Sequence, residues 1–389
     1  MFVITSMPVG GAETLLVNLM RRMDPQQVLP EVVCLKDPGP LGESIRDEFP
    51  VHSNYISSKW DLRVLPRLAG LFHRRHADAV VTVGAGDKMF WGRLAAHIAG
   101  VPVIGAALHS TGWPDGVGKL NRTLTGITDG FIAVADSHGQ FLKDFERFPA
   151  EKVSVIRNGI DCGRFMPDAK QRSELRRELG LDLAAPLIGI VAALRPEKNH
   201  SMLVHAAARL RPQFPDAHWV VIGDGPERES IEALARELDV QDHIHFLGTR
   251  HDTPDLLAGL DVFTLCSLNE ASPVSILESL ASGIPVVATD VGSVKESVVD
   301  GVTGALVPSQ DTNAMTEAIA SMLRDPEKRR EMGSAGRQLV ESHGSLQSMV
   351  DGYQQLITRL YDQRVTPQLS KQRIPCRVSQ TDEMVRLTK

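Results

Sequence analysis

Short apolar runs recur along most of the chain, and amphipathic stretches separate them. In the first half the runs lie at 2–5, 31–35, 79–83, 101–106 and 130–133, and in the second at 187–192, 218–222, 243–246, 262–265 and 285–288. Such runs, joined by stretches of helical periodicity, are typical of parallel strands buried on both faces. The pattern predicts an α/β protein with two doubly wound sheets.

Turn-forming residues separate the two series of runs. Asn158-Gly159-Ile160-Asp161 is typical of a turn, and a helical stretch at 171–179 precedes the next run. We therefore expect a first domain over 1–165 and a second over 166–345. We expect a helix over 346–364 to pack back towards the first domain. The segment 365–389 is polar and net positive, and we expect it to be a disordered tail.

Composition narrows the class of protein. A chain of 389 residues is too long for one ordinary core, and its net charge of -6 argues against a nucleic-acid-binding surface. Cys34, Cys162, Cys266 and Cys376 are far apart, which favours reduced thiols over disulfides or a zinc site. No apolar run approaches the roughly 20 residues that span a bilayer, and the start does not resemble a signal peptide. We expect a cytoplasmic enzyme, with a possible peripheral contact at the inner membrane face.

The strongest chemical signal is a pair of glutamates around a helix start. A helix is expected to begin near Pro273, because proline suits the first helical turn. Glu270 lies just before this helix, and Glu278 lies within it. Backbone N–H groups at such a start bind phosphate without a metal. The two carboxylates could then contact polyhydroxy groups on either side of a diphosphate. The alternative, a loop carboxylate and a solvated helix residue, is disfavoured by the complete loop, helix and strand pattern. The expected phosphate-binding residues are Ser272, Pro273, Val274, Ser275 and Ile276.

Three further strand-to-helix loops carry candidate chemistry. Gly10 and Gly11 let the backbone approach a phosphate, although a structural turn would look the same. Arg195 and Lys198 suit a diphosphate leaving group, the alternative being a surface ion pair. His109 ends a strand where ligands bind in such sheets, the alternative being a structural hydrogen bond.

Together these segments resemble the family 4 (group 1) glycosyltransferases, which have the GT-B fold of two Rossmann-like domains facing across a cleft. The resemblance extends over residues 1 to about 360. Its E-x7-E motif implies that Glu270 contacts the donor hexose and Glu278 the ribose. It also implies that Arg195 and Lys198 neutralise the diphosphate. The family's Gly-Gly-Ala-Glu loop implies that Gly10 and Gly11 face the donor diphosphate and the acceptor.

The same resemblance implies that His109 lies beside the donor sugar and that the loop containing Arg250 lies beside the nucleotide base. We expect His109 to orient the sugar or to stabilise charge. A Gly223-x-Gly225 turn invites a dinucleotide interpretation, but Arg228 stands where that fingerprint needs glycine.

The expected activity is retaining transfer of a hexosyl or N-acetylhexosaminyl group. The donor would be a nucleoside-diphosphate sugar, with UDP favoured by family frequency. The acceptor would be a glycan or a lipid-linked sugar in cell-surface polysaccharide synthesis. No two aspartates are separated by one residue, so we expect a metal-independent enzyme without a cofactor, the nucleotide sugar being a co-substrate. The alternatives are a nucleotide-sugar 2-epimerase of the same fold and a non-catalytic relative.

The segment 59–76 is basic with interleaved apolar residues, which could rest on an anionic membrane. A core-packed helix with a solvated basic face explains the same pattern and is favoured.

Overall fold

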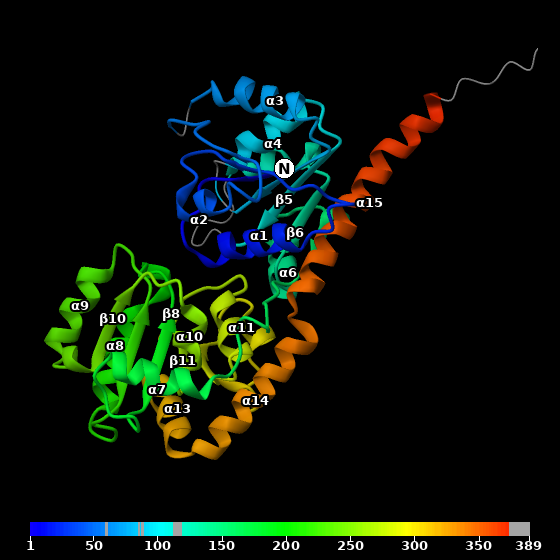
Figure 1. The fold of residues 1–389 in the computed structure, drawn as a ribbon. Helices are drawn as coiled ribbons and strands as arrows, with labels where there is room; N and C mark the ends of the chain where they lie inside the picture. Colours follow the sequence, from blue (N-terminus) through cyan, green and yellow to red (C-terminus); the bar gives the residue numbers. More distant parts are fainter. Residues whose placement is uncertain (59–60, 85, 87–88, 112–118, 373–389) are drawn as a thin grey trace, which may run out of the picture.

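The computed structural model describes residues 1–58, 61–84, 86, 89–111 and 119–372. They form two lobes, each built around one parallel sheet with helices on both faces (Figure 1). This confirms the predicted α/β class and the two doubly wound sheets.

The first sheet has seven strands in the order β3-β2-β1-β4-β5-β6-β7. All its pairings are parallel, so the carboxyl ends of its strands meet at one edge. The strands are β1 (Phe2–Ile4), β2 (Val32–Cys34), β3 (Val51–His52), β4 (Ala79–Val83), β5 (Val103–Leu108), β6 (Gly130–Ala133) and β7 (Val153–Val155). The α-helices are α1 (Gly11–Arg22), α2 (Gly39–Ser44), α3 (Val64–Arg74), α4 (Met89–Ile98), α5 (Lys119–Thr123) and α6 (Asp136–Asp144).

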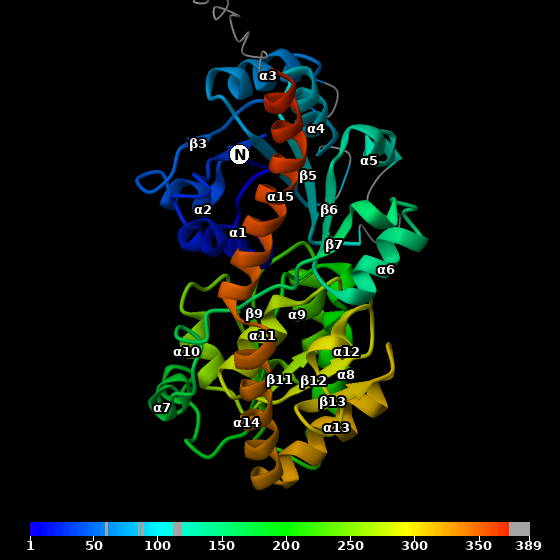
Figure 2. The ribbon, with the colours of Figure 1, turned by 90° about the vertical axis from the view of Figure 1, so that its right-hand side faces the viewer.

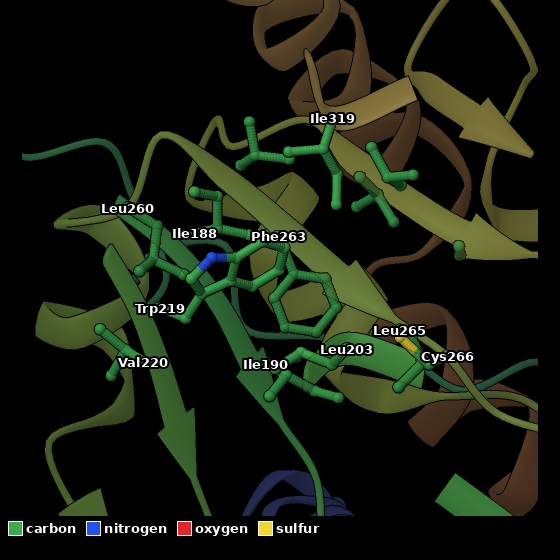
Figure 3. Close-up of a cluster of buried hydrophobic side chains, with 14 of the residues drawn as sticks. Ile188, Ile190, Leu203, Trp219, Val220, Leu260, Phe263, Leu265, Cys266 and Ile319 are labelled. Carbon is green, nitrogen blue, oxygen red and sulfur yellow. The ribbon is translucent and has the colours of Figure 1, made fainter. Parts of the chain in front are cut away.

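The second sheet has six parallel strands in the order β10-β9-β8-β11-β12-β13. Its core includes Trp219 and Phe263, which pack with aliphatic side chains of the neighbouring strands and helices (Figure 3). The strands are β8 (Leu187–Val191), β9 (His218–Ile222), β10 (Ile244–Gly248), β11 (Val262–Leu265), β12 (Val286–Thr289) and β13 (Gly304–Val307). The α-helices are α7 (Ala169–Glu178), α8 (His200–Leu210), α9 (Arg228–Glu237), α10 (Thr253–Ala258), α11 (Val274–Ala281), α12 (Val294–Ser297), α13 (Thr312–Arg324) and α14 (Pro326–His343).

The chain crosses between the lobes at two places, and the two crossings are hydrogen-bonded to each other. The Ile160 amide donates to Gly344 O (2.8 Å), and the Leu346 amide donates to Ile160 O (3.1 Å). A Cβ atom on Gly159 would lie 2.3 Å from Ser345 O, so only glycine fits there. The crossings therefore form one joint between the lobes.

Beyond this joint, α15 (Leu346–Gln372) lies along the first lobe (Figure 2). Its residues Met349, Val350, Tyr353 and Leu356 are buried in the first lobe's core. The helix continues to Gln372, past its expected end at residue 364. Extending an existing helix costs little, and polar composition alone does not end it. Residues 373–389 lie outside the described part.

The basic stretch around α3 packs against the first lobe's core, which was the alternative to a membrane contact. Val64, Leu68, Leu71 and Phe72 are buried in the first lobe, so the apolar side of the helix faces protein. Lys59 and Trp60, which belonged to the proposed membrane contact, lie outside the described residues. None of the helices in the described ranges is long and apolar enough to cross a membrane.

Candidate functional site

A cleft of about 810 Å³ lies between the two lobes, at the carboxyl ends of strands from both sheets. This is the edge at which doubly wound sheets bind ligands. The cleft brings together all but one of the residues singled out from the sequence. Those that line it are Gly10, Gly11, His109, Arg195, Lys198, Arg250, Glu270, Ser272, Pro273, Val274, Ser275 and Glu278.

Glu270 and Lys198 form an ion pair inside the cleft. Lys198 Nζ lies 2.5 Å from Glu270 Oε1, and the Ser267 hydroxyl donates to the same oxygen at 2.6 Å. Lys198 ends the short 3-10 helix Pro196–Lys198 after β8, whereas Glu270 follows β11, so neighbouring strands position the two charges. The Leu268 amide also donates to Glu197 O (2.8 Å), which holds the two loops together.

The start of α11 presents backbone donors to the cleft. Pro273 is its N-cap and has no side-chain cap, so the first amides of the helix keep no intrahelical acceptor. Val274 lies close to Gly11, since a Cβ atom there would be 3.4 Å from Val274 Cγ2. The starts of α1 and α11 therefore face each other, as an anion between them would require.

Ile276 is the one expected site residue that does not line the cleft. Its side chain is fully buried in the second lobe's core, and its amide donates to Pro273 O (3.2 Å). The tight first turn of α11 uses this amide internally. The donors that the sequence placed here are thus reduced to the amides of Ser272, Val274 and Ser275, since Pro273 has no N–H.

Glu278 lies about one turn into α11, and its side chain is buried. Burial raises its pKa to about 7, although Arg164 acts in the opposite direction. A solvated helix residue, the alternative considered for it, would not show this shift. Glu278 is therefore a buried carboxyl that titrates near neutral pH beside the cleft.

His109 follows β5 and is neutral at physiological pH, because burial lowers its pKa to about 4. Its Nε2 lies 3.4 Å from the hydroxyl of Tyr353 on α15. Its Nδ1 is buried and has no hydrogen-bond partner among the described residues. A neutral imidazole can orient a ligand by hydrogen bonding, which is one of the two roles expected for His109.

The two cleft arginines differ in their surroundings. Arg195 interacts electrostatically with Glu13 of α1. Burial raises the pKa of Glu13, and Arg195 only partly opposes this shift. Arg250 is already engaged, because it donates to Asp252 (2.7 Å) and to Glu178 (2.7 Å). Arg250 thus lines the cleft with its guanidinium held by carboxylates.

Several polar contacts in or beside the cleft escaped the sequence analysis. Ser267 fixes the Glu270 carboxylate, and its position just before Glu270 at a strand end was the available signal. The side-chain amide of Asn269 donates across the cleft to the Thr111 hydroxyl (2.6 Å). The Asn158 side chain donates to Ser272 O (3.1 Å). These last two contacts join distant segments, so sequence spacing gave no sign of them. In the described part of the chain, no group of three or more His, Cys, Asp or Glu side chains is arranged to hold a metal ion.

Comparison with known proteins identifies the family. Residues 171–339 match the family described as "Glycosyl transferases group 1", and residues 9–164 match "Glycosyltransferase Family 4". The chain is 30% identical to the putative glycosyltransferase EpsF of Bacillus subtilis (strain 168), over 82% of this chain and 86% of EpsF.

Two further proteins are similar to this chain. A GDP-mannose-dependent alpha-(1-6)-phosphatidylinositol monomannoside mannosyltransferase of Mycolicibacterium smegmatis is 33% identical over 49% of this chain and 52% of that protein. The crystal structure of Anabaena Alr3699/HepE in complex with UDP and glucose has a TM-score of 0.77 at 22% identity, covering 95% of this chain and 100% of that one. The chain belongs to the group 1, family 4 glycosyltransferases and has their two-domain GT-B fold.

Proposed function

We propose that this enzyme transfers a hexosyl or N-acetylhexosaminyl group, with retention, from a nucleoside-diphosphate sugar. The acceptor is a glycan or a lipid-linked sugar of cell-surface polysaccharide synthesis. One observation carries the proposal: the Lys198–Glu270 ion pair lies beside the uncapped start of α11 in a cleft between two lobes. This arrangement offers positive charge for a diphosphate and a carboxylate for sugar hydroxyls.

The reaction follows from where charge develops. As the bond between sugar and phosphate stretches, negative charge grows on the diphosphate, and Arg195, Lys198 and the α11 amides stabilise it. Glu270 and the neutral His109 hold the sugar, and Glu278 binds the ribose. The departing phosphate takes the proton of the attacking hydroxyl. The closed cleft excludes water, which would otherwise hydrolyse the donor.

The choice of UDP as donor rests on similarity. HepE was crystallised with UDP and glucose, whereas the mycobacterial relative uses GDP-mannose. Family frequency favours UDP. The mycobacterial relative acts on a lipid-linked mannoside, which supports an acceptor of that class.

A panel of UDP-, GDP- and ADP-sugars tests the proposal directly. Binding would be measured by calorimetry, and transfer or hydrolysis by release of the nucleoside diphosphate. We expect one nucleotide class to bind and to be turned over, and NMR of the product to give the same anomeric configuration as the donor. Acceptor-independent conversion of the sugar to its 2-epimer would support the epimerase instead. Binding without turnover would indicate a non-catalytic relative.

Metal removal is expected to leave transfer largely intact. The cleft supplies Arg195, Lys198 and helix-start amides for the diphosphate, so no divalent ion is required to neutralise it. Initial rates with and without EDTA would be compared at saturating donor, and we expect them to agree within about twofold. Complete loss that one divalent ion restores would contradict the metal-free mechanism.

Nucleotide affinity is expected to weaken as the pH falls through 7. The Glu278 carboxylate accepts hydrogen bonds from both ribose hydroxyls, and protonation near its pKa of about 7 removes part of that capacity. We expect the Kd of the nucleotide to rise roughly 3- to 10-fold between pH 8 and pH 6. Calorimetry on the wild type and Glu278→Gln checks this, because ionisation of the nucleotide affects both equally. The same pH slope in both proteins would contradict the assignment of Glu278.

A further inference from the structure

Glu296 belongs to the second lobe, but its carboxylate binds the first. One oxygen accepts from the Ser137 amide (2.7 Å) and the Ser137 hydroxyl (2.5 Å), and the other accepts from the Asp136 amide (2.8 Å). Asp136 and Ser137 open helix α6, so the negative charge lies where the helix dipole favours it. These bonds lower the pKa of Glu296 against the effect of burial. The contact therefore involves a charged carboxylate.

The segment that carries Glu296 also contacts the loop that carries Glu270 and Ala271, which we call the donor loop. A Cβ atom on Gly292 would lie 1.9 Å from Glu270 O, and the φ of Gly292 is +54°, so glycine is required twice over. The Ser293 amide donates to Glu270 O (3.2 Å), and its hydroxyl donates to Ala271 O (2.5 Å). Glu296 follows three residues later on α12. The donor loop and the segment that carries the Glu296 carboxylate are thus hydrogen-bonded to each other.

On the first lobe, the residues that bind Glu296 are followed by His138, which connects them to the cleft residue His109. His138, the next residue of α6, is buried, and it interacts electrostatically with both Glu296 and His109. Its Nδ1 accepts from the Val134 amide (3.3 Å), which fixes the start of α6 against the end of β6. The Glu296 contact therefore connects the loop of Glu270 to the surroundings of His109.

We propose that Glu296 is a positioning residue whose docking on the start of α6 holds the two lobes in the closed arrangement required for transfer. The proposal rests on the proposed function for its role in catalysis, but the contact itself does not. Glu296 does not line the cleft, so it acts through the Glu270 loop and through α6. Loss of the contact opens the cleft and admits water.

The test uses Glu296→Ala, with Glu296→Gln and Ser137→Ala as milder changes. Lys295→Gln is the matched control, since Lys295 is an exposed neighbour on the same short helix. We expect Glu296→Ala to lower kcat/KM for transfer roughly 10- to 100-fold, while the Kd of the nucleoside diphosphate changes less than about threefold. The ratio of donor hydrolysis to transfer should rise. Ser137→Ala, which keeps both amide donors, should show a smaller effect of the same kind.

Small-angle scattering tests the contact without any substrate. The radius of gyration of ligand-free Glu296→Ala should exceed that of the wild type and of Lys295→Gln, and circular dichroism should show that the variant remains folded. An unchanged radius together with unchanged kcat/KM would overturn the proposal. If the wild type neither binds nor turns over any nucleotide sugar, the proposed function fails, and scattering still decides whether Glu296 holds the lobes together. If Glu296→Ala does not fold, Glu296→Gln and Ser137→Ala carry the same comparison.

Discussion

Replacing Lys198 with alanine is expected to lower kcat/KM at least about 100-fold. The variant removes a cation that would stabilise the departing diphosphate, and it also leaves the buried carboxylate of Glu270 without its 2.5 Å partner. Both effects act on the transition state, so kcat should fall more than KM rises. Steady-state rates with the donor found in the nucleotide-sugar panel measure the change.

The control for this prediction is Lys170→Ala. Lys170 is an exposed lysine of the same lobe that pairs with Glu174 at 3.2 Å, and its loss should leave the rates unchanged. Melting curves of both variants separate an effect on the site from an effect on folding. If folded Lys198→Ala turned over the donor at the wild-type rate, Lys198 would have no role in the reaction.

The largest expected effect on stability comes from Asp261, the residue directly before β11. This buried carboxylate accepts hydrogen bonds from Arg176 (2.6 Å), from Arg172 and from the Leu187 amide (2.9 Å), and it forms an ion pair with Arg329 (3.2 Å). Replacing it with alanine leaves Arg176, itself fully buried, without its carboxylate partner. We expect the free energy of unfolding of the second lobe to fall by about 3–5 kcal/mol.

Urea unfolding followed by tryptophan fluorescence would measure this loss, because Trp219 reports on the second lobe's core. Asp239→Asn is the matched control: its carboxylate pairs with Arg211 at 2.9 Å on the surface, and a change below about 1 kcal/mol is expected. Similar unfolding midpoints for Asp261→Ala and Asp239→Asn would show that the arginine cluster does not stabilise the lobe.

The order of strands and helices could be predicted because each central strand is buried on both faces and therefore appears as an uninterrupted apolar run. β4, β6, β9 and β11 have the predicted bounds. The edge strands β3, β7 and β13 were not predicted. They are two to four residues long and only partly buried, so they leave little trace in the hydrophobic pattern.

The candidate site could be predicted as far as it depends on local geometry. The carboxyl ends of parallel strands meet at one edge, which is why loops as distant as those of Gly10, Lys198 and Glu270 could be assigned to one cleft. Two other details depend on atomic positions that a motif does not contain. The Ile276 amide donates within its own helical turn, and Arg250 donates to Glu178. The contact of Glu296 with Ser137 joins residues 159 positions apart on different lobes, and no spacing rule reaches that far.

The position of α15 has a consequence for how the protein is made. The ribosome releases the first lobe's strands and helices long before residues 346–356, which complete that lobe's core. While the second lobe is being synthesised, the place later filled by Met349, Val350 and Tyr353 exposes apolar residues such as Phe2 and Ile4 to solvent or to chaperones. We therefore expect a departure from the usual order, in which an N-terminal domain folds first during translation. The second lobe is the first that can close its own core.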